Sequence, residues 1–369
     1  MNNGVRTVLA VNAGSSSLKL AVSRADAAPA ALRISVDRHL DTPPRITGEP
    51  GLVSELSAAL ALPASRDYPA VVVALLAALR PLLPVTAVAH RVVHGGDETR
   101  ECVPLDAGER ARLHALAPLA PLHQPPALAI VDAVAAAQPA LLQFACLDTA
   151  FHAALPPEAR EYALPADIRA RHPELHAYGF HGLSCRWAVE QLRRAQALPP
   201  RLVIAHLGSG ASVTAVRDGA SIATSMGFSA LEGVPMATRP GRLDAGVLLY
   251  LLRRERIGVD ALEEMLYRRA GLLGLSGLSG DMRALLASDD PRAQAAVDYF
   301  VHHVAGETGR LAVALGGLDT LLFTGGIGEH QPAVRERIAA RLRAIAPQLA
   351  VQVIACDEEA VMAAAVLAG

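Results

Sequence analysis

The stretch Arg201–Gly219, RLVIAHLGSGASVTAVRDG, predicts a β-hairpin. An apolar run, Leu202–Ala205, leads into the tight turn His206–Gly210, and Ala211–Val216 then alternates small or apolar residues with polar ones. Glycines on both sides of Ser209 have no Cβ, so backbone N–H groups of this turn can close around phosphate oxygens. An ordinary hairpin turn explains Gly-Ser-Gly equally well, and this stretch alone leaves both interpretations open.

A second stretch near the start of the chain has the same organisation. Thr7–Arg24, TVLAVNAGSSSLKLAVSR, reads as apolar strand, polar residue, Gly/Ser turn and alternating strand. When the glycines are aligned, Asn12 falls opposite His206 and Gly14 opposite Gly208. Repetition of one supersecondary unit is a stronger signal than either copy alone. The pair of hairpins predicts two related α/β domains that face each other across a nucleotide.

Composition limits the classes of function. The chain has 369 residues, enough for two domains with separate cores, and its 34 basic and 36 acidic residues indicate neither a nucleic-acid nor a membrane partner. The first residues lack a secretory pattern, and the most hydrophobic run, Ala70–Leu79, is too short to span a bilayer. The cysteines lack CxxC spacing, which indicates neither a zinc site nor a disulfide framework; they are Cys102, Cys146, Cys185 and Cys356. We therefore expect a cytoplasmic protein.

Two rare residues lie in the first hairpin. Lys19 is the only lysine of the chain, and Asn12 is one of three asparagines, with Asn2 and Asn3. Lysine is a compact point charge that suits a phosphate oxygen in a tight loop, whereas arginine is a planar fork. Chance survival is the alternative explanation, but the pattern favours a functional pair.

Strands and helices alternate along the rest of the chain, which predicts an α/β fold with mixed sheets. The further expected strands are Leu32–Val36, Val85–Val93, Leu141–Leu147, Ala220–Met226, Leu318–Phe323 and Val351–Ala355. The expected helices are Tyr68–Leu83, Leu105–Ala117 after the N-cap Asp106, Ala127–Ala137, Leu183–Ala197, three segments between Gly246 and Leu315, and the last segment of the chain. Pro- and Gly-rich composition predicts irregular structure over Asp41–Gly51 and Pro118–Pro126. A domain boundary is expected between Phe151 and Pro157.

Motifs in a fixed order carry a resemblance to a known family. They are VNAGSSSLK at 11–19, HRVVHGG at 90–96, PLAPLH at 118–123, DTAFH at 148–152, YGFHGLS at 178–184, HLGSGAS at 206–212, TSMGF at 224–228 with LEG at 231–233, LSGLSGDMR at 275–283, FTGGIGE at 323–329 and DEE at 357–359. Together they extend through nearly the whole chain. The chain resembles the acetate kinase family, within the superfamily of actin, sugar kinases and Hsp70-like ATPases.

The resemblance implies a fold and a domain organisation. It implies two related actin-like, ribonuclease H-like domains with mixed sheets around an interdomain nucleotide cleft. The first would comprise residues 1–150 and 356–369, and the second, nucleotide-binding domain residues 151–355. It also implies a homodimer.

The resemblance further implies the reaction: reversible in-line transfer of a phosphoryl group between ATP and acetate, with Mg²⁺ or Mn²⁺, to give acetyl phosphate and ADP. The acceptor carboxylate already carries its charge, so the difficulty is to bring two anions together. A propionate- or butyrate-preferring kinase of the same family is one alternative. A non-kinase, chaperone-like ATPase on the same fold is another, because fold does not fix function. The arginine and histidine motifs favour the kinase, since a gated ATPase needs no carboxylate clamp.

Four catalytic residues follow from the resemblance: Arg91, Asp148, His181 and Arg239. Each arginine can grip a carboxylate or phosphoryl group with two hydrogen bonds, and His181 fits a donor to the transferring group. Asp148 fits a catalytic or orienting carboxylate. Surface ion pairs for the arginines, a satisfied core histidine and an ordinary helix cap are the structural alternatives.

The remaining site residues are also implied by the resemblance. Asn12 and Glu358 match metal-linked positions, with Glu359 an equal candidate for the second. The nucleotide site matches Lys19, His206, Leu207, Gly208, Ser209, Gly210, Asp281, Met282, Arg283, Gly325, Gly326, Ile327, Gly328 and Glu329. The carboxylate site matches Arg91, Val93, Leu122, His123, Phe180 and Ala230. Departures from the family pattern occur at Ser209, Pro240, Arg242, Cys185 and Ala230, where Asn, Ser, an acidic residue, His and Pro are usual, and they bear on substrate choice and efficiency.

Overall fold

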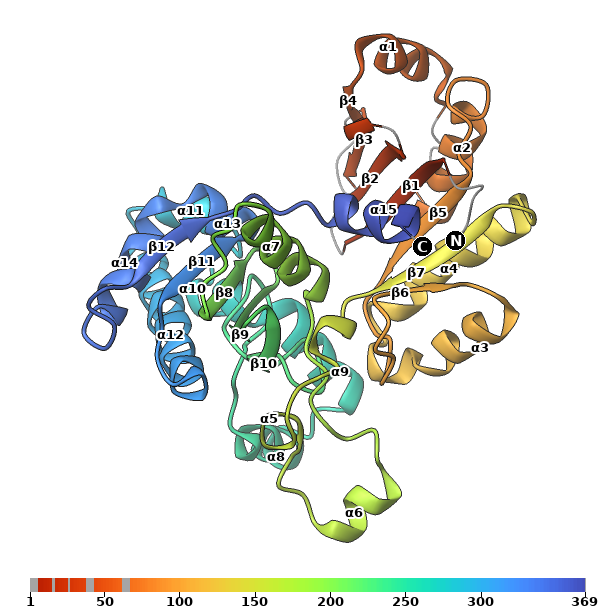
Figure 1. Cartoon of the computed structure of the whole chain (residues 1–369). Coiled ribbons are helices and arrows are strands. Elements are labelled where there is room, and N and C mark those ends of the chain that lie inside the picture. Colours follow the sequence, from red (N-terminus) through yellow and green to blue (C-terminus); the bar gives the residue numbers. More distant parts are fainter. Residues whose placement is uncertain (1–5, 15–16, 26, 38–42, 62–66, 369) are drawn as a thin grey trace. The chain divides into compact units, whose positions relative to one another are not determined.

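A computed structural model describes residues 6–14, 17–25, 27–37, 43–61 and 67–368 (Figure 1). The chain divides into two compact units, Met1–Ala150 with Asp357–Gly369, and Phe151–Cys356. The first unit is therefore discontinuous in sequence, because the second is inserted before its last helix.

The first unit is a mixed sheet with helices on both faces. Its strands run in the order β4-β3-β2-β1-β5-β7-β6; β1 pairs antiparallel with β2 and parallel with β5, and β5 pairs parallel with β7. Its elements are β1 (Thr7–Ala13), β2 (Ser17–Arg24), β3 (Ala27–Asp37), β4 (Arg45–Gly48), α1 (Pro50–Ala59), α2 (Tyr68–Leu79), β5 (Ala87–Val92), β6 (Cys102–Pro104), α3 (Ala107–Ala115), α4 (Gln124–Ala137), β7 (Leu142–Leu147) and α15 (Glu358–Ala368).

The second unit repeats the central part of this arrangement. Its sheet has the order β10-β9-β8-β11-β12, with an antiparallel hairpin β8–β9 and parallel pairs β8–β11 and β11–β12. Its elements are α5 (Pro157–Arg160), α6 (Ala166–Arg171), α7 (Gly182–Arg194), β8 (Arg201–Leu207), β9 (Ala211–Arg217), β10 (Ala220–Thr224), α8 (Ala245–Arg254), α9 (Val259–Glu264), α10 (Gly271–Ser276), α11 (Met282–Leu286), α12 (Pro291–Leu315), β11 (Thr320–Thr324), α13 (Gly325–His330), α14 (Pro332–Leu342) and β12 (Ala350–Val353). Both sheets thus share the order third strand, second strand, first strand, then two parallel strands, and the repeated hairpins are confirmed.

Successive side chains of β1 point to opposite faces of the first sheet, and different helices cover the two faces. Leu9 and Val11 belong to a core with the buried side chains of α2 and with Ile130 of α4. The intervening positions point to the other face, where α15 contacts β1, β2 and β5 (Figure 1). This second face carries polar groups as well as apolar ones, because Asn12, the residue after Val11, points to it.

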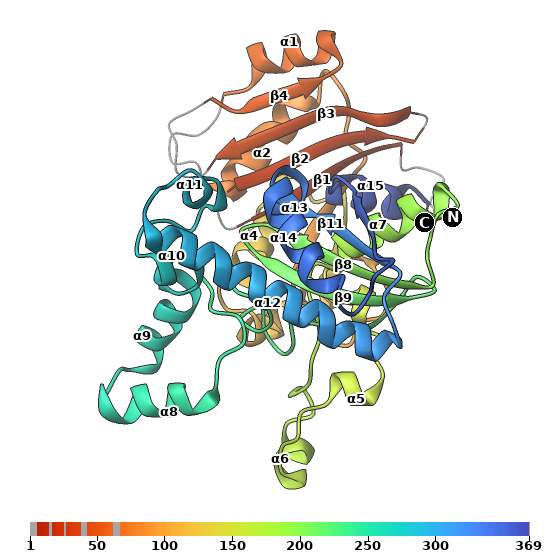
Figure 2. The ribbon, with the colours of Figure 1, turned by 90° about the vertical axis from the view of Figure 1, so that its left-hand side faces the viewer.

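Both faces of the second sheet are covered in the same way. Leu202 and Ile204 of β8 pack with the buried residues of α7. The alternate residues, Val203 and Ala205, are fully buried as well, and the long helix α12 runs along β8, β9 and β10 (Figure 2). The β8–β9 hairpin therefore lies at the centre of a core that covers both faces of the sheet.

Two expectations about irregular segments are wrong. Within Asp41–Gly51, Arg45–Gly48 is a strand that pairs with β3, and α1 begins at Pro50; Asp41 and Thr42 lie outside the described residues. Within Pro118–Pro126, α4 already begins at Gln124, with prolines in its first turn. Proline is tolerated there because the first N–H groups of a helix have no partner within it.

A membrane-spanning element is also absent from the part of the chain that the structure describes: no helix in it has both the length and the apolar character to cross a bilayer.

Candidate active site

A row of polar side chains crosses the first sheet at one end of its strands. Asn12 of β1 is the Cα partner of Lys19 of β2. Val11 is the partner of His90, so Asn12 lies beside Arg91 in β5, and Arg91 is in turn the partner of Cys146 in β7. The Arg91 Nη1 atom donates to Asn12 Oδ1 at 3.2 Å, which places both side chains on the same face. The row thus brings together Lys19, Asn12 and Arg91.

Asp148 fixes the orientation of Arg91. Arg91 Nε donates to Asp148 Oδ2 at 2.9 Å, and Nη2 donates to the same oxygen. The Asp148 side chain is fully buried and that of Arg91 is 15% exposed, so this is not a surface ion pair. The Asp148 N–H donates to the carbonyl of Val92 at 3.1 Å, which ties the end of β7 to β5. The guanidinium is therefore held at a defined angle.

Asn12 also gathers two carboxylates from the start of α15. Its Nδ2 atom donates to Glu358 Oε2 at 2.8 Å and to Glu359 Oε1 at 2.7 Å. Burial, and then the charge of Glu358, raise the pKa of Glu359, while the hydrogen bond from Asn12 and the charge of Lys19 lower it. Both glutamates remain candidates for the metal, because both contact Asn12.

The donor set at this point fits a hard cation. Two buried carboxylates and a side-chain amide oxygen are the ligand types that Mg²⁺ and Mn²⁺ take in proteins. Arginines also lie beside the two carboxylates: Arg91 Nη1 is 3.8 Å from Glu358 Oε2, and Arg33 Nη1 is 4.0 Å from Glu359 Oε2. The ion pair of Arg33 with Asp357 anchors the segment that presents them, with Nη1 and Oδ1 3.1 Å apart.

The loop after β5 is held by two residues that the sequence reasoning did not single out. Gln124 is fully buried; its Oε1 accepts from the N–H of His94 at 3.2 Å, and its Nε2 donates to the carbonyl of His94 at 2.9 Å. The Oγ1 atom of Thr149 accepts from the N–H of Gly95 at 3.1 Å. Gln124 directly follows His123 and Thr149 directly follows Asp148, and both preceding residues were predicted to lie in the site. This adjacency was the one signal in the sequence that could have identified them. Val93, buried, begins this loop, and half-buried Leu122 and His123 precede α4.

In the second unit, His181 is the N-cap residue of α7 and has an unusual backbone conformation. Its φ of 60° is left-handed, a conformation that costs a non-glycine residue about 1–3 kcal/mol. The Nδ1 atom hydrogen-bonds with Ser212 Oγ at 3.0 Å, and the ring stacks on His206 with centroids 4.4 Å apart. His206 Nδ1 is itself 2.8 Å from Ser184 Oγ. Strain of this kind, held in place by several partners, is characteristic of functional sites.

The turn after β8 receives both His181 and Arg239. A Cβ at Gly210 would lie 2.7 Å from Arg239 Nη2 and 3.2 Å from His181 Nε2, so both side chains closely approach the backbone of this glycine. Arg239 Nη1 donates to the carbonyl of Ala230 at 2.8 Å, which links the arginine to the expected acyl-pocket residue. The structure therefore joins three predicted site segments at Gly210.

The other expected nucleotide segments lie around the same turn. A Cβ at Gly208 would be 4.0 Å from the nitrogen of Gly326, and the N–H of Ala237 donates to the carbonyl of Ser209 at 3.1 Å. Ala237 in turn lies against Gly280, which precedes α11. The residues concerned are Leu207, Gly325, Ile327 and Gly328 beside Gly208 and Gly326, and Asp281, Met282 and Arg283 after Gly280.

Three of these side chains, those of Glu329, Asp281 and Arg283, have partners within the protein. Glu329 Oε1 accepts from the N–H groups of Gly325 and Cys356, each at 2.9 Å, so it shapes the turn before α13. Asp281 caps α11, and its ion pair with Arg283 at 2.7 Å lowers the pKa of the carboxyl group.

Two other histidines, His90 and His152, are buried in the core. Burial lowers the pKa of His90 and of His152 to about 4, so both rings are neutral at pH 7. His152 Nδ1 is 2.9 Å from Ser221 Oγ and its Nε2 is 3.0 Å from the carbonyl of Phe180. His152 thereby positions buried Phe180, the residue before His181.

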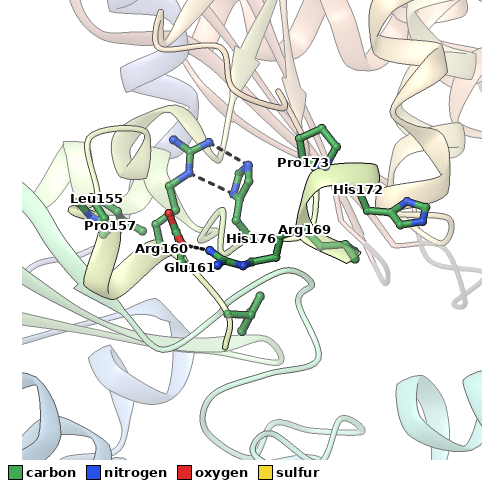
Figure 3. Close-up of a pocket in the computed structure, with 10 residues that line it drawn as sticks. Leu155, Pro157, Arg160, Glu161, Arg169, His172, Pro173 and His176 are labelled. Atoms are coloured by element: carbon green, nitrogen blue, oxygen red, sulfur yellow. Dashed lines mark hydrogen bonds and ion pairs between the residues drawn. The ribbon is translucent and has the colours of Figure 1, made fainter. Parts of the chain in front are cut away.

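A surface pocket in the second unit involves none of the predicted site residues. It has a volume of about 360 Å³ and is lined by the segment 155–176. Its side chains pair with each other: Arg160 Nη2 lies 2.8 Å from His176 Nε2, and Arg169 Nη1 donates to Glu161 at 2.6 Å (Figure 3). The pocket is therefore separate from the cluster at Gly210.

Comparisons with known proteins point to one family. The acetokinase family profile matches residues 7–364. An acetate kinase of Rhodopseudomonas palustris (strain TIE-1) is 42% identical over 339 residues, 90% of this chain and 85% of the relative, and one of Nitrobacter hamburgensis is 44% identical over 345 residues, 91% and 84%. Among solved structures, the acetate kinase of Entamoeba histolytica has a TM-score of 0.82 at 27% identity and covers 97% of this chain and 98% of that one. A propionate kinase of Francisella tularensis has a TM-score of 0.81 at 30% identity and covers 98% and 99%. These likenesses confirm the predicted two-domain, actin-like α/β fold class.

Proposed function

This chain belongs to the acetokinase family, and from that membership we propose that it transfers the terminal phosphoryl group of ATP to acetate and forms acetyl phosphate and ADP. It is a kinase whose acceptor is a carboxyl group. The observation that carries the proposal is the arrangement around Arg91. A largely buried guanidinium, oriented by a fully buried carboxylate, is the group needed to hold an anionic acceptor.

We assign the reaction chemistry to two clusters. Arg91, held by Asp148, binds the carboxylate of the acceptor, and Asp148 is a positioning residue because its own carboxylate contacts Arg91. Arg239 and His181, which meet at Gly210, donate hydrogen bonds to the transferring phosphoryl group. Donors that are already in place stabilise the charge that develops on the equatorial oxygens, without reorganisation.

We assign the metal to Asn12, Glu358 and Glu359. Bound there, Mg²⁺ would neutralise charge on the phosphates of the nucleotide. Asn12 orients both carboxylates through its amide, and Lys19, its neighbour across the hairpin, adds a positive charge beside them. The turns at 206–210 and 325–329, together with Asp281 to Arg283, are assigned to ATP.

Propionate is a second candidate acceptor, and Ala230 favours it. The position is usually proline in the family, and alanine removes ring atoms from the acyl pocket that Val93, Leu122, His123 and Phe180 are expected to complete. A related structure is a propionate kinase, at 30% identity. A cytoplasmic location and a homodimer stay predictions.

Trapping with hydroxylamine tests the activity. The purified chain is incubated with ATP, Mg²⁺ and acetate, propionate or butyrate, and the acyl phosphate is measured as hydroxamate. We expect carboxylate-dependent hydroxamate in amounts equal to ADP, and none after chelation of the metal. ADP release without hydroxamate would instead identify a non-kinase ATPase and overturn the proposal.

A further inference from the structure

Cys102 and Cys146 lie directly opposite each other in the first unit. They are Cα partners across the antiparallel pair β6–β7, and their Sγ atoms are 3.5 Å apart. Spacing in the sequence concealed this pair, because the two residues are 44 positions apart and belong to no motif. All four cysteines of the chain lie in its described part and are thiols.

The backbone places this pair at a position that a disulfide can occupy. The N–H of Leu147 donates to the carbonyl of Glu101 at 2.9 Å, and the N–H of Leu105 donates to that of Gln143 at 2.8 Å. Hydrogen-bonded and non-hydrogen-bonded pairs alternate, so Cys102 and Cys146 form a non-hydrogen-bonded pair. In such pairs the Cα atoms are about 4.5 Å apart, inside the range of about 4.4–6.8 Å found for disulfides.

The same strand carries the proposed carboxylate site. On its other side Cys146 is the Cα partner of Arg91, and it precedes Asp148 by two residues. A covalent bond to β6 therefore acts on the strand whose end orients Arg91.

We propose that Cys102 and Cys146 are a site of reversible oxidation by hydroperoxides. The sulfur of Cys102, a partly exposed residue, attacks the peroxide O–O bond and becomes a sulfenic acid, and one molecule of water is formed from hydrogen peroxide. The Cys146 thiol then displaces the hydroxyl group of the sulfenic acid as a second water, and the S–S bond forms. Two thiols and one peroxide thus give one disulfide and two waters, and an external dithiol reverses the change.

The environments of the two thiols support this order. Cys146 is fully buried, and the contact with Cys102 together with burial raises its pKa. A thiol of raised pKa is a poor first nucleophile, so the attack on peroxide falls to Cys102.

Oxidation is expected to lower the kinase activity, a consequence that rests on the proposed function. The sulfur atoms must close from 3.5 Å to about 2.05 Å, and the adjustment that closes them falls on Cys146, the Cα partner of Arg91. Misplacement of a catalytic group by about 1 Å can cost about a hundredfold in rate. We expect a loss of at least about fivefold.

Mass spectrometry of the full chain tests the site itself. After treatment with hydrogen peroxide and alkylation under denaturing conditions, we expect two reactive thiols in place of four and one cross-linked peptide that joins positions 102 and 146. Cys102→Ser and Cys146→Ser should each abolish the cross-link, and the control Cys356→Ser should retain it. Four alkylated cysteines, or oxidation without this cross-link, would overturn the proposal.

Activity provides the second, separate readout. The oxidised wild type should lose hydroxamate formation and regain it with dithiothreitol, whereas peroxide should leave the activity of Cys102→Ser unchanged. A cross-link with full activity would overturn the effect on catalysis and leave the oxidation site standing. A chain that makes no acyl phosphate before oxidation would contradict the proposed function instead, and the peptide map would still decide the site.

Discussion

The two hairpins, β1–β2 and β8–β9, occupy the same place in their sheets and differ in chemistry. In each turn a glycine N–H donates to a carbonyl across it: Gly14 to Ser17 at 2.8 Å, and Gly208 to Gly210 at 2.9 Å. A Cβ at Gly14 or Gly208 would lie only 3.1 or 3.2 Å from the same oxygen. In both copies, therefore, a side chain at this position would require the facing carbonyl to move by a few tenths of an ångström.

The aligned side chains diverge from that common frame. Asn12 is paired with Lys19 and gathers two carboxylates, whereas His206 is paired with Ser212 and stacks on His181. One copy thus acquires a cluster suited to a cation and the other an imidazole pair at a phosphate-type turn. The repeat fixes where a side chain is presented, and the residue at that place decides what it binds.

The largest expected effect tests whether both units supply a reacting group. Arg91→Ala and Arg239→Ala should each lower kcat/KM by about a hundredfold or more, because each removes a preorganised positive group. Hydroxamate kinetics measure the loss, and thermal unfolding followed by circular dichroism shows whether the fold is intact. Exposed arginines provide matched controls, Arg100→Ala in the first unit and Arg217→Ala in the second.

Arg91→Ala removes the ion-pair partner of buried Asp148 and could therefore unfold the chain. Arg91→Lys keeps a positive charge there and is the second variant. It should remain folded and still lose most of its activity, since an ammonium lacks the planar fork. Near-normal turnover in both alanine variants would remove the arginine assignments.

A second prediction separates the two carboxylates at Asn12. Glu358→Gln or Glu359→Gln should raise the Mg²⁺ concentration for half-maximal activity by about tenfold or more in whichever variant has lost the metal-linked group. Titration of activity with Mg²⁺ at saturating ATP measures it, with exposed Glu55→Gln as the control. An unchanged requirement in both variants would place the metal elsewhere.

The third prediction concerns the residue that only the first hairpin has, Lys19. Lys19→Arg should lower kcat/KM by about fivefold to tenfold despite equal charge, because a planar guanidinium does not reproduce the compact point charge of an ammonium at a phosphate oxygen. Steady-state kinetics with varied ATP measure the change. Full ATP affinity and rate in the variant would show that charge alone suffices.

A fourth, smaller effect concerns Ala230, whose carbonyl accepts a hydrogen bond from Arg239. One methylene is worth about 0.8 kcal/mol, a few-fold in affinity. Propionate should be a good substrate, and Ala230→Pro should shift preference toward acetate by a comparable few-fold. The ratio of kcat/KM values for acetate, propionate and butyrate decides it; an unchanged ratio means that neighbouring side chains set the chain length.

The smallest effect is on stability. The pKa of Glu359 is raised in the folded chain, so the native state binds more protons than the unfolded state, and stability falls as pH rises from about 4.5 through the folded pKa. Each unit by which the pKa is raised corresponds to about 1.4 kcal/mol. In metal-free buffer, urea denaturation should show this decline in wild type and in Glu55→Gln, and a flatter profile in Glu359→Gln. Equal pH profiles would contradict the burial argument.

Local patterns predicted most of the fold. Period-two alternation and glycine turns located both hairpins, and Asp106 was correctly expected to cap α3, where it accepts from the N–H of Glu109. The errors came from composition: Pro50 and Pro125 suggested irregular structure but occupy first helical turns, where proline is tolerated.

Partnerships between distant segments were harder to predict. Motifs named Arg91 and Asp148 but not their ion pair, and they named neither Gln124 nor Thr149, whose contacts hold the loop after β5. The thiol pair of Cys102 and Cys146 depends on the register of β6 against β7, which no local pattern contains. Non-local pairing of this kind follows from the folded topology, so it could not be predicted from local sequence patterns.

The discontinuity of the first unit has a consequence for synthesis. Asn12 is made early, but its partners Glu358 and Glu359 follow the whole inserted segment Phe151–Cys356. At roughly 5–20 residues per second, that insertion delays them by roughly 10 to 40 s. During this interval the nascent first unit has its hairpin but lacks the helix that covers one face of the sheet. The cation cluster therefore forms last, after the second unit has had time to fold, and a ribosome that stalls within the insertion leaves a chain without it.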